Sequence, residues 1–156
     1  MLDLYTPRTK TPDELKMKYE GKSVSPKECL ACPMVIHHFE FTRSRFNEGR
    51  YLLVAQISYW KNTENALIEK AVLMTEGTSL CKTMRIAESK GITGPFQTKI
   101  IRGRKDWTMF FVRLSKPEVA KLAGARDPCP PDGKIGWLTV DGPTPFDLDT
   151  DQGISS

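Results

Sequence analysis

The sequence predicts a mainly β domain with a few short helices and an acidic, disordered C-terminal tail. Stretches rich in β-branched and aromatic residues, several with a period of two, alternate with glycine- and asparagine-containing turns. The 156 residues suffice for one domain that buries its own core. Charged residues make up 27% of the chain, and no apolar run approaches the roughly 18 residues of a membrane-spanning helix. These features exclude membrane-spanning, fibrous and wholly disordered classes.

Residues 1–33 are expected to form one helix and a loop ahead of the main domain, which spans residues 34–126. Thr11 and Glu14 have the spacing of a helix-starting capping box, and Gly21 suits a helix C-terminus. The remainder of this segment contains two X-Pro pairs and is typical of a loop. The first residues contain no long apolar run, so no secretory signal is expected.

The clearest pair of strands spans Val35–Arg45 and Tyr51–Trp60. Asn47 to Gly49 between them provide a turn, with a glycine where a left-handed conformation is expected. This spacing predicts a β-hairpin. One side of its first strand is expected to carry Val35, His37, Phe39 and Phe41, and the core side of its second strand Tyr51, Leu53, Ala55, Ile57 and Tyr59.

The segment after the hairpin contains one ambiguous element and one clear helix. Residues 66–75 are ambiguous because helix-forming residues precede an ending typical of a buried strand. Thr78 can then cap a helix from Ser79 to about Lys90. The buried face of that helix is expected to contain Leu80, Met84 and Ala87.

Two further strands and a second helix complete the predicted domain. Phe96–Arg102 and Trp107–Leu114 are predicted strands, separated by a charged turn. Ser115 is expected to cap a helix over Lys116–Leu122, because Glu118 completes a capping box three residues later.

The C-terminal extension, residues 127–156, differs from the body in composition and in charge. It is rich in proline and glycine, and only Ile135–Val140 has strand character. It holds six acidic residues and one basic residue, whereas residues 1–126 hold 22 basic and 13 acidic residues. A basic body that carries an acidic, disordered tail favours a polyanionic partner, above all nucleic acid.

The order of elements is strand, strand, strand, helix, strand, strand. This order resembles that of the oligonucleotide/oligosaccharide-binding fold, or OB-fold. The resemblance covers roughly residues 34–115 and implies a five-stranded barrel with a helix between its third and fourth strands. It requires residues 66–75 to be a strand. If they are helical, an α+β domain of sheet and helices is the alternative.

The OB-fold resemblance implies a nucleic-acid ligand on the exposed face of the second and third strands, flanked by the loops that follow the first and fourth strands. Here both loops are basic, and each contains an aromatic residue. Single-strand binding needs cations along the phosphates and flat side chains that stack on bases. Alternation puts Phe110, Val112 and Leu114 in the core, although Trp107 and Phe111 could instead cover the other side of the domain. The expected nucleic-acid-binding residues are Arg43, Arg45, Phe46, Arg50, Trp60, Lys99, Arg102, Arg104, Lys105, Trp107, Phe111 and Arg113.

The tail is similar in composition to the acidic C-termini of small single-stranded-DNA-binding proteins of bacteria and phages. The similarity rests on residues 145–151, Pro-Phe-Asp-Leu-Asp-Thr-Asp. It implies replication proteins as partners of the tail, or competition between the tail and nucleic acid for the basic groove. The chain ends in Gly-Ile-Ser-Ser rather than in an acidic tip closed by Pro-Phe, which departs from the bacterial pattern. A purely solubilising end is the alternative.

Four cysteines without a secretory signal predict free thiols in a reducing compartment. Cys29 and Cys32 form a C-x-x-C pair, and His37 and His38 follow it. A zinc site needs four converging ligands, and the chain has no second pair of this kind. A site made of Cys29, Cys32, a histidine and Cys129 is the alternative to simple thiols, and no cofactor is expected.

The sequence contains no common catalytic motif: no nucleotide-binding glycine loop, no G-x-S-x-G and no H-E-x-x-H. We therefore expect a non-catalytic protein that binds single-stranded DNA in replication or recombination, without a membrane partner, in the cytoplasm of a bacterium or a phage-infected cell. RNA as the ligand and a homodimer as the assembly are left open. Two other hypotheses are a small viral or mobile-element interaction or inhibitor module with a basic face, and a zinc-stabilised domain.

Overall fold

The computed structural model describes residues 19–43, 51–92, 95–104, 108–122, 136–139 and 142–144. The body of the predicted N-terminal helix and the acidic end of the chain lie outside these residues. The strands are β1 (Lys22–Val24), β2 (Met34–Arg43), β3 (Tyr51–Lys61), β4 (Ala66–Thr75), β5 (Phe96–Arg102), β6 (Met109–Val112), β7 (Gly136–Thr139) and β8 (Gly142–Thr144), and the helices are α2 (Thr78–Ser89) and α3 (Lys116–Lys121).

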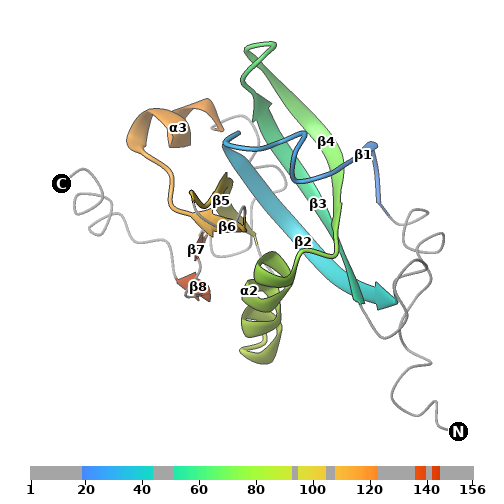
Figure 1. Ribbon diagram of the computed structural model, residues 1–156. Coiled ribbons are helices and arrows are strands. Elements are labelled where there is room, and N and C mark those ends of the chain that lie inside the picture. The colour runs from blue at the N-terminus through green and yellow to red at the C-terminus, as the bar shows by residue number, and fades with distance from the viewer. Residues whose placement is uncertain are drawn as a thin grey trace, which may run out of the picture.

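The strands form one mixed sheet in the order β1-β4-β3-β2-β5-β7-β8, and β6 pairs with β5 beside this path. The central strands pair antiparallel, whereas β1 joins β4 and β7 joins β5 in parallel. In Figure 1 the long strands β2 to β4 occupy one half of the molecule and the shorter strands β5 to β8 the other. Segments on both sides of residues 34–126 thus contribute strands to the same sheet.

The predicted hairpin is confirmed, and the ambiguous segment is a strand. Met34 pairs with Tyr59 and Arg43 with Tyr51 across β2 and β3, while residues 66–75 form β4. The loop expected from residue 22 onward is wrong at its start, because β1 lies there and pairs with β4. A parallel edge strand of three residues has too little sequence for a period-two pattern, which is why it was missed.

A closed five-stranded barrel is not confirmed. The five strands that correspond to the expected barrel pair in the order β4-β3-β2-β5-β6. Closure would require the outer edges of β4 and β6 to pair with each other. Within the described residues, β4 instead pairs with β1 on that edge, and β6 pairs with β5 alone. The fold is therefore mainly β, with an open mixed sheet.

A β-bulge in β2 changes which of its side chains face the core. The register against β3 shifts at His37, the extra residue of the bulge. Met34 and Ile36 before it lie in the same core cluster as Phe39 after it. The predicted alternation, which put Val35 and His37 on the side of Phe39, is wrong before the bulge, because one extra residue reverses the parity of the strand.

Ser58 of β3 connects this bulge to a second register shift between β3 and β4. Its Oγ lies 2.8 Å from His37 Nε2 and donates a hydrogen bond to the carbonyl oxygen of Glu69 at 2.6 Å. Because the hydroxyl has a single proton, His37 Nε2 must be the donor in the other bond. Burial lowers the pKa of His37, and the neighbouring His38 lowers it further. The folded sheet therefore favours the neutral imidazole.

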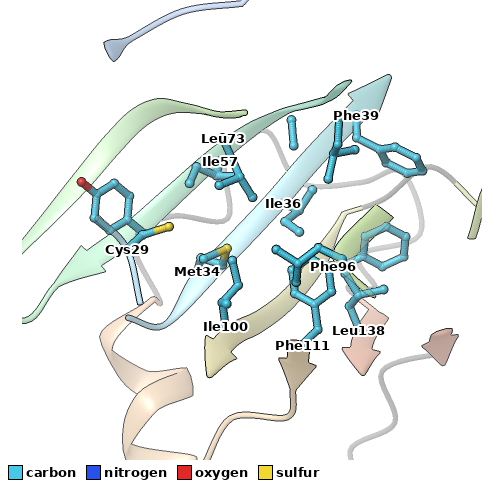
Figure 2. Packing of buried hydrophobic residues seen from close by; sticks show 14 of the residues in the cluster. Cys29, Met34, Ile36, Phe39, Ile57, Leu73, Phe96, Ile100, Phe111 and Leu138 are labelled. Atoms are coloured by element: carbon cyan, nitrogen blue, oxygen red, sulfur yellow. The ribbon is translucent and has the colours of Figure 1, made fainter. Parts of the chain in front are cut away.

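The main core lies between α2 and one face of the sheet. The predicted helix face is confirmed, with Leu80, Met84 and Ala87 buried, but Gly77 rather than Thr78 is the N-cap, because Thr78 is already helical. Two smaller clusters lie outside the main core, one around Trp137 and one around Tyr19. Figure 2 shows the centre of the main core, with Cys29, Met34, Ile36, Phe39, Ile57, Leu73, Phe96, Ile100, Phe111 and Leu138.

Candidate nucleic-acid interface

Helix α3 lies at the end of the sheet where β2 begins (Figure 1). Ser115 caps it as predicted: its Oγ accepts from the Glu118 N–H at 3.4 Å, and Glu118 Oε1 accepts from the Ser115 N–H at 2.8 Å. Such N-capping stabilises a helix by about 1 kcal/mol. Leu114 and Leu122, on either side of the helix, are buried in one cluster with Trp137. Capping and packing together fix the position of this short helix.

An ion pair connects α3 to β5. Lys99 Nζ donates to Glu118 Oε2 at 2.8 Å, and the two side chains are 25% and 18% exposed. Burial raises the pKa of Glu118, but the hydrogen bonds from Lys99 and Ser115 outweigh burial, so this pKa is lowered overall. Glu118 is therefore ionised at neutral pH and forms an ion pair with Lys99. The predicted DNA contact of Lys99 thus competes with a partner within the fold.

A second contact connects α3 to β3. Lys121 Nζ lies 5.9 Å from the centroid of the Trp60 ring, within the range of a cation–π interaction. Trp60 is half-buried near the end of β3, whereas Lys116 and Lys121 are exposed. We call Trp60, Lys116 and Lys121 the α3 surface. It combines one flat ring with two exposed ammonium groups.

The excess positive charge of the described residues belongs to the segments that carry the α3 surface and its neighbours. Residues 95–104 and 108–122 hold six basic residues and one acidic residue, Glu118, which is already paired. The other described residues hold eight basic and seven acidic residues. A cationic surface with an adjacent aromatic ring is what single-stranded nucleic acid requires.

Two of these six basic residues, Arg102 and Arg104, lie at the β5–β6 connection. Arg104 is exposed in a turn that is closed by a 2.7 Å hydrogen bond from the Gly103 N–H to the Thr108 carbonyl oxygen. Arg102, at the end of β5, is half-buried. Lys105 and Trp107, which the sequence assigns to the same loop, lie outside the described residues.

Arg43 lies at the other end of β2. It is the last residue of this strand and pairs with Tyr51, whereas Met34, the first residue, pairs with Thr98 of β5. At about 3.3 Å per residue, a strand of this length separates its two ends by roughly 30 Å. The structure therefore does not place Arg43 in one cluster with Arg104. Arg45, Phe46 and Arg50, predicted beside Arg43, lie outside the described residues.

Phe111 is a core residue, and its predicted role as a stacking platform is wrong. It is 0% exposed and pairs with Ile100 of β5 (Figure 2). The prediction chose the wrong side of β6, because apolar residues occur on both sides of this strand. Arg113 does not face an open groove either: it is half-buried, and its guanidinium carbon lies 4.6 Å from the centroid of the Trp137 ring.

The outer face of β3 is covered along part of its length. Tyr19 is 6% exposed and packs against Val54 and Val72. The Gln56 side chain accepts a hydrogen bond from the Glu20 N–H at 2.8 Å and donates one to the Glu20 carbonyl oxygen at 2.7 Å. The residues just before β1 thus cover the strand face that the OB-fold resemblance assigns to the ligand.

Arg85 of α2 is a second cationic feature, and the sequence prediction missed it. Its guanidinium carbon lies 5.0 Å from the ring centroid of Phe41 and 4.9 Å from that of Tyr51. The helical spacing of Lys82 and Arg85 was visible in the sequence, but their proximity to two strands depends on the tertiary fold. A groove of about 410 Å³ beside them is lined by Tyr51, Glu76, Thr78, Cys81, Lys82 and Arg85.

Cys29 and Cys32 are buried thiols. Burial raises the pKa of Cys29 to about 12, with a further contribution from Cys32, and its Sγ donates to the Ser25 carbonyl oxygen at 3.5 Å. No group of three or more His, Cys, Asp or Glu side chains is placed to hold a metal ion in the described part of the chain. Cys129, the other predicted ligand, lies outside it.

The described surface can neutralise phosphates and stack against bases, through the lysines and Trp60 at one end of β2 and through Arg85 at the other.

Neither α2 nor α3 combines the length and apolar character that crossing a membrane requires. Comparison of the chain with protein-family models, with curated proteins and with solved structures gives no match, so its function has to be inferred from the chemistry of these surfaces.

Proposed function

We propose that this chain is a non-catalytic protein that binds single-stranded DNA without sequence preference and acts in replication or recombination, in the cytoplasm of a bacterium or a phage-infected cell. The observation that carries the proposal is the excess positive charge of the β5-to-α3 segments beside the half-buried ring of Trp60. Neither feature alone would indicate nucleic acid, because solvated lysines and half-buried tryptophans are common. Their combination matches the two requirements of single-strand binding.

Phosphate contacts supply the first part of the mechanism. Lys116, Lys121 and Arg104 are exposed, so each can replace a counterion at a phosphate. For single strands, the slope of log affinity against log salt is about −0.7 per phosphate contact. Three contacts therefore predict a slope of about −2. The magnitude is larger if residues outside the described part of the chain also contact phosphates.

Base stacking on Trp60 supplies the second part. Stacking on an aromatic side chain contributes about 1–3 kcal/mol per base and tolerates any sequence. Trp60 pairs with Leu67 of β4, so the backbone that carries the ring is ordered before the ligand arrives, which reduces the entropy cost of binding. We propose that the strand follows α3 and the end of β5, because Tyr19 and Glu20 cover part of the β3 face.

The direct test is fluorescence anisotropy of a labelled oligo-dT of about 30 bases, long enough for any single-domain site, between about 50 and 200 mM salt. We expect salt-sensitive binding that unlabelled single strands displace better than duplex DNA does. Trp60→Ala should weaken binding at least fivefold, and Trp60→Phe should recover most of the loss. Binding that does not change with salt, or none at micromolar protein, would contradict the proposal.

An acidic protein partner is the second candidate, because the same lysines would match an acidic surface. Nucleic acid requires the Trp60 ring as well as the charges, whereas an acidic peptide needs mainly the charges. Protein purified from crude lysate without nuclease should therefore show a high 260/280 nm absorbance ratio under the first hypothesis and an ordinary ratio under the second.

A further inference from the structure

The groove beside Arg85 lies at the end of β2 away from the α3 surface and is lined by β3, by α2 and by the connection before α2. Tyr51 begins β3, Glu76 lies between β4 and α2, and the other lining residues belong to the first two turns of α2: Thr78, Cys81, Lys82 and Arg85. Its volume of about 410 Å³ lies within the range of sites that hold small organic ligands, about 300–1,000 Å³. It is therefore large enough for one nucleotide.

Arg85 is held by packing and leaves its hydrogen-bond donors available. Its guanidinium contacts the rings of Phe41 and Tyr51, and the side chain is exposed. No hydrogen bond or ion pair to Arg85 occurs among the described residues. A guanidinium that rings hold in place, with its planar fork of N–H groups unused, is well suited to a phosphate.

The other lining residues restrict what the groove can take. Lys82 is exposed and lies three residues before Arg85 on the same helix, so both cations lie on one side of the groove. Glu76 contributes a carboxylate to the lining. Burial raises the pKa of the Cys81 thiol, so the thiol adds no further negative charge at neutral pH. A ligand with one anionic group and one flat, uncharged group fits this lining.

We propose that this groove binds one nucleotide of the DNA strand, with its phosphate on Arg85 and Lys82 and its base against the ring of Tyr51. This assignment rests on the proposed function and adds a second contact point to it. The phosphate would meet a planar donor, and the base would meet a ring that β3 and Arg85 already hold in place. Arg43, at the adjacent end of β2, lies next to this contact.

The test compares the affinity of labelled oligo-dT of about 30 bases for matched variants. Arg85→Ala and Tyr51→Ala should each weaken binding about five- to twentyfold, whereas Tyr51→Phe should stay within about twofold of the unmodified chain, because the ring alone carries the contact. Lys90→Ala, an exposed lysine at the far end of the same helix, controls for loss of charge. Thermal unfolding must be unchanged, and Arg85→Lys, which keeps the charge without the planar fork, should be intermediate.

The outcomes separate this inference from the proposed function. If the unmodified chain does not bind oligo-dT, the proposed function fails and the inference fails with it. If Trp60→Ala weakens binding but Arg85→Ala and Tyr51→Ala match Lys90→Ala, only the groove assignment is overturned. If free dTMP displaces a labelled dTMP from the groove while oligo-dT does not, the groove is a mononucleotide site, and its assignment to the strand is overturned.

Discussion

The two ends of β2 carry two kinds of cationic surface. At its start, Lys116 and Lys121 extend from a short helix as exposed ammonium groups. At its end, the Arg85 guanidinium packs on two aromatic rings that belong to the sheet. Flexible, strongly hydrated lysines attract a polyanion over distance, whereas a held guanidinium fixes one phosphate in one orientation. If the chain binds single-stranded DNA as proposed, this difference assigns the gathering of the strand to the α3 end and its positioning to the Arg85 end.

The largest expected effect distinguishes Phe111, a core residue, from Trp60, which is proposed to contact DNA. Phe111→Ala should lower the free energy of unfolding by about 3–5 kcal/mol, because the side chain is fully buried. Trp60→Ala should cost far less stability and act on affinity instead. Chemical denaturation of both variants, with Phe111→Leu as a milder substitution, measures the difference. A Phe111→Ala protein of unchanged stability that no longer binds DNA would reverse our assignment.

Replacing lysine by arginine at one end of β2, and arginine by lysine at the other, tests directly whether the two ends differ. Lys121→Arg should change oligo-dT affinity by less than about twofold, because an exposed point charge is replaced by another cation. Arg85→Lys should weaken binding more, because an ammonium group cannot reproduce the planar contact with two rings. Anisotropy titrations at one salt concentration compare the two. Equal effects would show that both ends act only through charge.

The His37 bulge lies in β2 between the two ends and should make the fold sensitive to acid. Because the pKa of His37 is lowered in the fold, the unfolded chain takes up a proton first as the pH falls. The stability from neutral His37 is therefore fully present above its ordinary pKa of about 6.5 and is lost as the pH falls through the folded value. His37→Gln should flatten this dependence in denaturation curves, whereas His38→Gln, at the only other histidine, should reduce it only in part, because burial is the larger cause of the shift and remains.

The smallest expected effect concerns Glu118, which forms the ion pair with Lys99. Glu118→Gln keeps a residue that a capping box accepts but frees Lys99 from its ion pair. We expect a stability loss of less than about 1 kcal/mol and a small gain in oligo-dT affinity, with a salt slope steeper by about 0.7. A weaker affinity in this variant would show that the ion pair positions α3 for binding.

The strands were predictable where the local sequence pattern, alternation with flanking turn residues, is enough to specify them. The β2–β3 hairpin and β5 follow from alternation and turn residues, and α3 follows from its capping box. β1 was not predictable, because it exists only through pairing with β4, far along the chain. The open sheet likewise depends on which distant edges meet, and element order does not contain that information.

The candidate site was predictable in part. Trp60 and Arg104 could be named from aromatic and basic character near strand ends, and Lys99 was also named, although it pairs with Glu118. Phe111 was assigned to the exposed face of β6. Because both faces of this strand carry apolar residues, the sequence does not indicate which face is buried. Arg85 was missed because its significance comes from Phe41 and Tyr51, which only the tertiary fold brings to it.

The most direct test of the central claim is the salt dependence of oligo-dT affinity for the Lys116→Ala/Lys121→Ala variant. The matched control is Lys22→Ala/Lys90→Ala, which removes two exposed lysines elsewhere. We predict that the slope of log affinity against log salt falls in magnitude by about 1.4 in the first variant, which corresponds to two lost phosphate contacts, and stays unchanged in the control. Equal slopes in the two variants would contradict the claim that the α3 surface binds the phosphates of single-stranded DNA.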